Sequence, residues 1–427
     1  MKKSKFFFLF VITFIALLFI VFIYQKKGNK IVINLWDYPR WREKNSTDRF
    51  FWIKKQIKKF QKKYPEVKIN FTPMTWNQGY QKLLFSLRYG NAPDIFPVNV
   101  EEYYYFHSIA EFEDLTPILS KKEWKDFDKN CMKFFEKNGK IYVLPFYRSG
   151  IVLFVNKTYV KRYHIPLNLK KWDINSFYNF VRSGTIDLDN NGTIDIWGFA
   201  AILKSSKRSL WPFLVYGDKN INDSLNFSTE TFRKNIKFIY KLTKKNILPL
   251  KVLTMSEIKV NKDFFNGKFL CYSAGLYLTQ IIEKMKREGT LNYEFDILPY
   301  PSTDNLNYAF YSIAGYSVLK QKKLQKRKYC FEFLRQLYKS HYNYRAYKVL
   351  PVRNSHLKYI KGDEFLAKAY EIFKNGLIFY PHPYWSEIDD IVQRILMEIL
   401  FGNLNIDEGI SKIQHEVNQL LEEKGEK

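Results

Sequence analysis

The stretch Gly139–Lys157, GKIYVLPFYRSGIVLFVNK, decides how the rest of the chain is organised. It begins at the turn signal Asn138-Gly139 and continues through apolar, β-favouring residues that Pro145 and Gly150 interrupt. A central core strand tolerates neither interruption well, because proline removes a ladder hydrogen bond and glycine adds backbone entropy. Taken alone, the stretch fits two interpretations: a bulged β-hairpin, or a strand that leaves one compact body and enters another.

Length and composition favour more than one domain. A chain of 427 residues with 46% hydrophobic residues is long enough for two or three cores. Lys plus Arg exceed Asp plus Glu by 69 − 42 = 27, which can indicate an anionic neighbour. The lysines are spread along the whole chain, however, and no nucleic-acid-binding module is recognisable. We therefore expect no nucleic-acid partner.

The residue types needed for common catalytic and metal sites are scattered. The three cysteines form no close pair and the six histidines show no short ligand spacing, so we expect neither a disulfide framework nor a zinc site. The chain contains no GxSxG motif, no P-loop and no Cys/His nucleophile signature, which argues against an enzyme. Glu387, Asp389 and Asp390 belong to an amphipathic helical pattern and are interpreted as a solvated face.

The first thirty residues are typical of a membrane anchor. An uncharged apolar run extends from Phe6 to Tyr24, with lysines on both sides. As a helix this run is about 28 Å long, enough to span the bilayer core. No A-x-A cleavage pattern follows it, as a signal peptide would require. We therefore predict an uncleaved transmembrane helix within residues 1–30.

From Lys30 onward the pattern alternates between strands and helices. Alternating apolar residues predict strands at 31–35 and 67–71, and a third short strand starts at Ala92; helical spacing fills the gaps between them. This β-α-β-α-β order favours a largely parallel sheet, whose ligands gather beyond the carboxyl ends of the strands. The residues expected near that edge are Trp36, Asp37, Trp76, Asn77 and Asp94.

Several segments resemble, in the same order, the extracellular solute-binding proteins of carbohydrate ABC importers, a group similar to maltose-binding protein. The similarity covers nearly all of the chain after the predicted anchor. The segments that carry it are KKFQKKYPEVKINFTPMTWNQGYQKLLFSLRYGNAPDIF (58–96), GKIYVLPFYRSGIVLFVNKTYVKRY (139–163), FFNGKFLCYSAGLYL (264–278), YEFDILPYPS (293–302) and LPVR (350–353).

The resemblance implies an α/β, two-lobed periplasmic-binding-protein-like fold of type II, preceded by the N-terminal transmembrane helix. It implies crossings between the lobes near residues 147–152 and 295–300, and a third around 318–321. The first lobe would comprise residues 31–148 plus 298–319, and the second lobe residues 149–297 plus 320–427. On this view Gly139–Lys157 is a crossing between lobes.

The resemblance also implies a cleft that closes on a sugar. Sugars offer apolar C–H faces for aromatic stacking and hydroxyls for hydrogen bonds. Each aromatic residue in these segments could instead belong to the core, and this alternative is strongest for Trp211. The predicted ligand-binding residues are Trp36, Asp37, Trp76, Asn77, Asp94, Tyr147, Arg148, Trp211, Tyr277, Tyr316 and Trp385.

These inferences predict a membrane-anchored, extracytoplasmic carbohydrate-binding protein that delivers its ligand to the permease subunits of an ABC importer. We expect a monomer that needs no cofactor. The Gram-positive members of the family usually carry a lipid-modified N-terminal cysteine, which is missing here. This departure leaves a second function open: a sugar sensor that reports to a membrane kinase. A wall-associated glycan enzyme is a third alternative.

One acidic loop resembles part of an EF-hand. The sequence DLDNNGTID, residues 187–195, places oxygen ligands at the spacing of a calcium loop and a glycine at its sharp turn. The bidentate glutamate is missing, because position 12 is Gly198. Either a structural calcium site or a loop whose side chains cap their own backbone fits this pattern. The predicted metal ligands are Asp187, Asp189, Asn191, Thr193 and Asp195.

Overall fold

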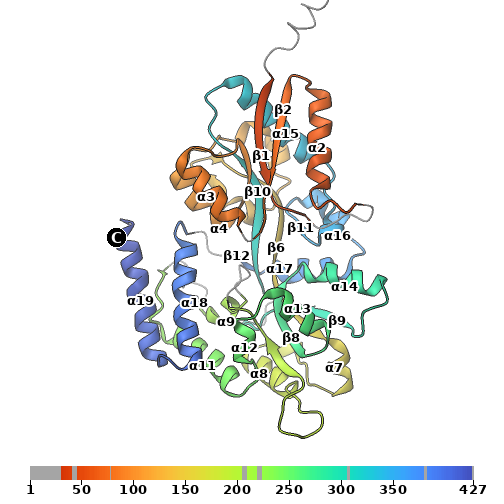
Figure 1. Cartoon of the computed structure of the whole chain (residues 1–427), viewed down its shortest axis with the longest axis vertical. Coiled ribbons are helices and arrows are strands. Elements are labelled where there is room, and N and C mark those ends of the chain that lie inside the picture. Colours follow the sequence, from red (N-terminus) through yellow and green to blue (C-terminus); the bar gives the residue numbers. More distant parts are fainter. Residues whose placement is uncertain are drawn as a thin grey trace, which may run out of the picture.

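The computed structural model describes residues 30–40, 46–76, 78–203, 209–218, 224–304, 308–378 and 382–425. Nearly all of the predicted membrane anchor, residues 1–30, lies outside this set. No helix within the described ranges has the length and apolar character needed to cross a bilayer. Figure 1 shows two bodies of helices and strands, one above the other, with the long strands β6 (Leu144–Asn156) and β10 (Phe310–Val318) running between them.

The upper body in Figure 1, which we call the first lobe, is built on three neighbouring strands in the order β2-β1-β3. All three are parallel, as the alternating sequence pattern predicts. α15 packs against α2 and β1 although it follows them by more than 250 positions. The main elements are β1 Ile31–Asp37, α2 Phe51–Lys63, β2 Val67–Pro73, α3 Gly79–Tyr89, β3 Ile95–Asn99, α4 Val100–Ile109 and α15 Leu324–Lys339. Smaller elements are η1 Thr116–Ile118, α5 Lys121–Trp124, α6 Lys129–Met132, β4 Glu136–Lys137 and β5 Lys140–Ile141.

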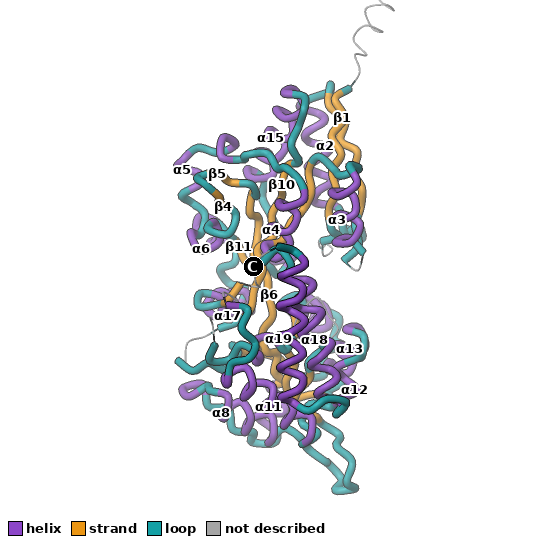
Figure 2. Tube along the Cα trace, turned by 90° about the vertical axis from the view of Figure 1, so that its left-hand side faces the viewer, coloured by secondary structure: helices purple, strands orange, loops and turns teal. Residues whose placement is uncertain are grey.

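The lower body, the second lobe, surrounds the far half of β6. There β6 pairs with β8 and β9, and β8 pairs in parallel with β7. The C-terminal helices α18 and α19 pack against each other and against α11 (Figure 2). The strands are β7 Trp197–Ala200, β8 Phe269–Gly275 and β9 Phe295–Leu298. The helices are α7 Lys157–Arg162, η2 Leu169–Lys171, α8 Ile174–Ser183, α9 Trp211–Leu214, α11 Glu230–Lys244, α12 Leu250–Leu253, α13 Glu257–Phe265, α14 Leu278–Arg287, α17 Glu364–Phe373, α18 Trp385–Phe401 and α19 Ile406–Glu423.

The stretch that starts at Gly139 enters β6, which runs from the first lobe into the second. A glycine is required at position 150 for steric reasons, because a Cβ there would overlap the backbone of the neighbouring strand at Phe310. The proline of this stretch lies at an irregularity: the register between β6 and β10 shifts where Pro145 pairs with Gly315 and Tyr147 pairs with Ala314. The two sequence interpretations therefore combine, since this is a crossing strand that also contains a bulge.

The other two connections lie at different places from those predicted. β9, within the predicted crossing at 295–300, pairs with β6 inside the second lobe. The strand that returns to the first lobe is β10, whose far end pairs with β3. The third connection is also displaced from 318–321. It passes through α16 (Tyr344–Tyr347), β11 (Leu350–Pro351) and η3 (Asn354–Tyr359), and β11 pairs with β6. β12 (Leu377–Ile378) pairs with β10.

These connections shift the lobe boundaries as well. Residues 298–304 lie with the second lobe, where the Tyr300 hydroxyl is 2.6 Å from Ser273 Oγ on β8. α15 lies with the first lobe, although the sequence interpretation assigned residues 320–427 to the second. The reason is that several neighbouring segments are equally apolar, and periodicity does not reveal which partner strand or helix each of them meets.

Candidate functional site

A cleft of about 1840 Å³ lies between the two lobes. The first lobe contributes residues after β1 and from α3 and α4, and the second lobe contributes residues from α13, α14 and α18. The crossing strands β6 and β10 supply residues between these two walls. Ligand pockets for small molecules typically measure about 300–1,000 Å³, so this cleft has room for an extended ligand.

The first-lobe wall carries a stacked aromatic pair. The rings of Tyr38 and Trp76 are nearly parallel, with an interplanar angle of 3° and centroids 4.3 Å apart. Tyr38 is buried, whereas Trp76 is 50% exposed. Gly79 makes room for this arrangement, because a Cβ at that position would overlap the Tyr38 ring. The pair therefore presents one flat, supported aromatic face to the cleft.

A buried ion pair lies beneath the same wall. Arg40 Nη2 is 3.0 Å from Asp37 Oδ1, and both side chains are almost fully buried. Arg40 also donates hydrogen bonds of 2.8 Å to the hydroxyls of Tyr147 on β6 and Tyr316 on β10. Burial by itself lowers the pKa of Arg40, but the Asp37 carboxylate raises that pKa well above its ordinary value. The guanidinium therefore stays charged and links the strand-end loop to both crossing strands.

The second-lobe wall contains a short hydrogen-bonded chain. The Tyr277 hydroxyl donates to Glu257 Oε1 at 2.6 Å and accepts from Asn261 Nδ2 at 3.0 Å. Burial and the nearby Glu257 carboxylate both raise the pKa of Tyr277 far above its ordinary value. The phenol therefore remains protonated at neutral pH, and this wall offers carboxylate, amide and hydroxyl groups to a ligand.

The first turns of α18 complete the second-lobe wall. Trp211 Nε1 donates to Asp389 Oδ1 at 2.5 Å, and the rings of Trp211 and Trp385 lie 4.8 Å apart. Asp389 was interpreted as part of a solvated helix face, but it is only 6% exposed and lines the cleft. The difference arises because α18 packs into the lobe beside Trp211, a partner that is distant in sequence.

The structure brings most of the predicted binding residues together. Trp76, Tyr147, Tyr277 and Trp385 line the cleft. Asp37, Tyr316 and Trp211 lie directly behind it and contact lining residues through the bonds described above. Whether these side chains bind a ligand stays a prediction.

Three predicted residues lie away from the cleft, and Asn77 lies outside the described residues. Trp36 packs beneath the Lys82 ammonium, 4.7 Å from its ring centroid. Asp94 precedes β3 instead of following it, and it pairs with Lys326 at 2.7 Å. Arg148 points away from its neighbour Tyr147, because adjacent side chains of a strand alternate between faces, and it pairs with Asp128 at 3.2 Å.

Sequence reasoning missed several lining residues. β3 ends at Asn99, so its carboxyl end is followed by Glu101 and Glu102 in the first turn of α4. The Glu102 side chain accepts the Asn99 amide at 3.1 Å, which completes a capping box. The motif N-x-x-E at 99–102 could have located this strand end. Arg40 and Glu257 carried no comparable signal, because each is identified as a cleft residue only by distant partners.

The acidic loop lies far from the cleft. It connects α8 to β7 and projects at the lower end of Figure 1. Ligand oxygens of Asp187, Asp189 and Asp195 lie within 4.8 Å of one another. The Asp187 carboxylate also accepts the backbone amides of Asn191 and Gly192, at 3.2 and 2.7 Å. Both interpretations of this loop therefore remain open, and calcium binding stays a prediction.

The comparisons with known proteins place the chain in a family. The model of the bacterial extracellular solute-binding protein family matches residues 55–373. The chain belongs to this family. Its similarity to an arabinooligosaccharide-binding protein from Bacillus subtilis (strain 168) is 28% identity over 153 residues. That match covers 34% of this chain and 34% of the relative.

Solved structures of solute-binding proteins share the fold. An ABC substrate-binding protein from Listeria monocytogenes in complex with cycloalternan superimposes with a TM-score of 0.72 and 17% identity, over 92% of this chain and 99% of the other. The maltose/maltodextrin-binding domain MalE from Bdellovibrio bacteriovorus bound to maltotriose gives a TM-score of 0.71 and 16% identity, over 92% and 100%. The predicted resemblance and the two-lobed α/β solute-binding fold are thus confirmed.

Proposed function

We propose that this solute-binding protein binds a carbohydrate in the interlobe cleft and delivers it to an ABC importer. The observation that carries the proposal is the cleft itself: a flat Tyr38–Trp76 aromatic face on one wall opposes a hydrogen-bonding wall of Glu257, Asn261 and Tyr277. Carbohydrates need both features, because they combine apolar C–H faces with many hydroxyls. The sugars bound in related structures, cycloalternan and maltotriose, support the same ligand class.

In this proposal the lobes close around the sugar, and the closed form is the one that the permease recognises. A ligand that contacts both walls favours closure by the difference between its affinities for the closed and open forms. The proposal contains no catalytic step, since the proteins of this family are solute-binding proteins.

The test is a thermal-shift screen of residues 30–427 against neutral monosaccharides and oligosaccharides, followed by isothermal titration of each hit. A ligand at 100 times its Kd stabilises the folded state by about 2.7 kcal/mol, which gives a clear rise in Tm. Sugar alcohols of matched size serve as controls. If no sugar raises the Tm or releases heat, the proposed ligand class is refuted.

We also propose that residues 1–30 anchor the protein in the membrane with the lobes on the outside. The apolar run between two lysine clusters supports this assignment, and membership of an extracellular family supports the location of the lobes. Fractionation of cells that express the full chain tests the anchor. Recovery of an intact chain from the membrane fraction after a high-salt wash is expected, and release of a shortened chain into the medium would contradict it.

A further inference from the structure

The three connections between the lobes lie side by side in one sheet. β6 has β10 as its antiparallel neighbour, and β11 pairs with β6 at Arg148 and Tyr147. The third connection leaves α15 in the first lobe, passes through β11 and reaches α17 in the second lobe. Any rotation of one lobe against the other must therefore be absorbed in or beside these strands.

The third connection is fixed to the first lobe at Arg353. The Nε of this arginine donates to Asp126 Oδ2 at 2.8 Å, and its Nη1 donates to the Tyr338 carbonyl at 3.2 Å. Its guanidinium lies 4.0 Å from the centroid of the Tyr338 ring. Ser355 donates to the same aspartate. Several independent contacts thus hold the segment that follows β11 against the first lobe.

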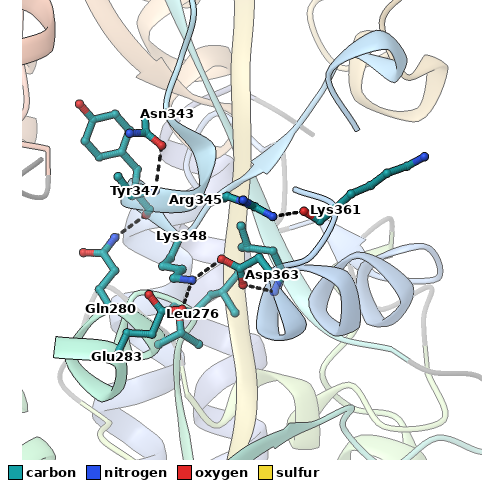
Figure 3. Close-up of polar contacts among 12 residues, drawn as sticks. Leu276, Gln280, Glu283, Asn343, Arg345, Tyr347, Lys348, Lys361 and Asp363 are labelled. Atoms are coloured by element: carbon teal, nitrogen blue, oxygen red, sulfur yellow. Dashed lines mark hydrogen bonds and ion pairs between the residues drawn. The ribbon is translucent and has the colours of Figure 1, made fainter. Parts of the chain in front are cut away.

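The other end is held by Lys348 (Figure 3). Its side chain is 2% exposed, and its ammonium pairs with two carboxylates of the second lobe, Glu283 on α14 and Asp363 at the start of α17. Asp363 also caps α17 by accepting the Leu366 amide at 3.1 Å. A nearby cleft residue, Gln280, donates to the Tyr347 carbonyl.

The backbone at Lys348 is unusual as well. Its φ is +48°, in the left-handed region, which a residue with a side chain adopts only when its surroundings demand it. This conformation ends α16 and turns the chain into β11. The two ion pairs of Lys348 hold the backbone in this conformation, because moving the lysine away would leave the buried Asp363 carboxylate without its cation.

We propose that Lys348 is a positioning residue that fixes the third connection to the second lobe at the point where β11 begins. From there β11 runs antiparallel to β6, back to the first lobe at Arg353, before the chain reaches α17. Without the Lys348 ion pairs, α16 and β11 would lose these contacts with α14 and α17, and the range of lobe orientations would widen. An effect of Lys348 on ligand affinity would rest on the proposed function, whereas its effect on the relative orientation of the lobes does not.

The experiment measures lobe geometry without any ligand. Spin labels at Phe85→Cys on α3 and Ser411→Cys on α19 report the distance between the lobes, and the native cysteines 131, 271 and 330 are all buried. Lys348→Met keeps the length of the side chain and removes its charge. Lys368→Met is the matched control, because it breaks the 2.7 Å pair with Asp296 in the same lobe but outside the connection.

We expect the interlobe distance distribution of Lys348→Met to be wider than that of the parent, and that of Lys368→Met to be unchanged. Glu283→Gln removes only one of the two partners and should widen the distribution less. If Lys348→Met fails to fold, Glu283→Gln alone decides. A parental distribution in every folded variant would overturn the proposal and leave Lys348 a purely stabilising residue. A failure of all sugars to bind would refute the proposed function while leaving this measurement valid.

Discussion

At the scale of single residues, Trp76 combines exposure with a fixed orientation. It is half exposed in the cleft and stacked on the buried Tyr38 ring. Removal of its indole by Trp76→Ala should weaken sugar binding about tenfold, since an aromatic contact contributes on the order of 1 kcal/mol beyond its buried area. Isothermal titration checks this change.

A matched control exists on the neighbouring helix. Phe85 is 65% exposed on α3 and does not line the cleft, so Phe85→Ala should leave the affinity unchanged. Neither substitution should lower the Tm by more than a few degrees, because neither removes a buried side chain. Equal affinities for the Trp76→Ala variant and the parent would show that the stacked pair is only structural.

Asp37 illustrates a different role, because it supports the cleft from beneath. Asp37→Asn should leave the buried Arg40 guanidinium without its counter-charge and lower the free energy of unfolding by about 3–5 kcal/mol. Urea denaturation measures this loss. The control Asp48→Asn breaks the exposed pair with Lys54 and should change the free energy of unfolding by less than about 1 kcal/mol. Similar losses in both variants would contradict this account of the cleft floor.

The position of a residue in the cleft was predictable where a strand end could be located from the local pattern. Trp76 follows β2, which alternates cleanly, and the structure places it in the cleft. The prediction for Asp94 is wrong because β3 starts at Ile95 and ends at Asn99, which puts Asp94 before the strand and not after it. Arg40 could not be found, since its role depends on Tyr147 and Tyr316, more than 100 positions away.

At the scale of elements, the helix η3 that follows Arg353 carries a titratable group. His356 Nδ1 is 2.8 Å from the Tyr344 hydroxyl. Burial, and secondly Arg353, lowers the pKa of His356 to about 4. In the unfolded chain His356 has a pKa near 6.5 and therefore takes up a proton at pH values where the same residue in the folded chain stays neutral. Stability should fall as the pH drops from about 6.5 to about 4.

The His356→Gln variant isolates this contribution. Its free energy of unfolding should decline less steeply than that of the parent over this pH range, as measured by urea denaturation at several pH values. His415→Gln, at an exposed position on α19, is the control and should keep the parental slope. Parallel curves for all three proteins would show that His356 takes up its proton equally in both states.

The acidic loop between α8 and β7 permits a direct test of metal binding. If the loop binds calcium, isothermal titration of the parent should give heat with a Kd of roughly 0.1–1 mM, the range of weak extracellular sites. Asp187→Asn combined with Asp189→Asn should abolish that heat. An absence of heat in the parent would establish the alternative, a loop whose carboxylates only accept backbone amides such as that of Gly192.

Element type was easier to predict than element partnership. The turn at Asn138-Gly139, a signal in the sequence, forms the β4–β5 hairpin with φ of +53° and +72°. Gly90 ends α3 in the left-handed conformation. The partner strands of β9 and β10 were not predictable, since both strands are apolar and only long-range contacts decide which of them returns to the first lobe.

At the scale of the whole molecule, the proposed closure should change the molecular envelope. Small-angle scattering of residues 30–427 should show a smaller radius of gyration when the protein is saturated with its sugar than when it is free. The Trp76→Ala variant should need a higher sugar concentration for the same contraction. An envelope that stays constant at saturation would mean that binding occurs without closure.

The order of strands in the sheet also constrains how the chain can be made. β3 pairs with β10, so Ile95 meets Val318, and the first lobe further requires α15 up to Lys339. The second lobe likewise needs α17 to α19 from the end of the chain. During synthesis, neither lobe can complete its core until most of the polypeptide has left the ribosome. Contacts this distant in sequence are expected to make folding slow, which would leave time for translocation of the unfolded chain before its strands pair.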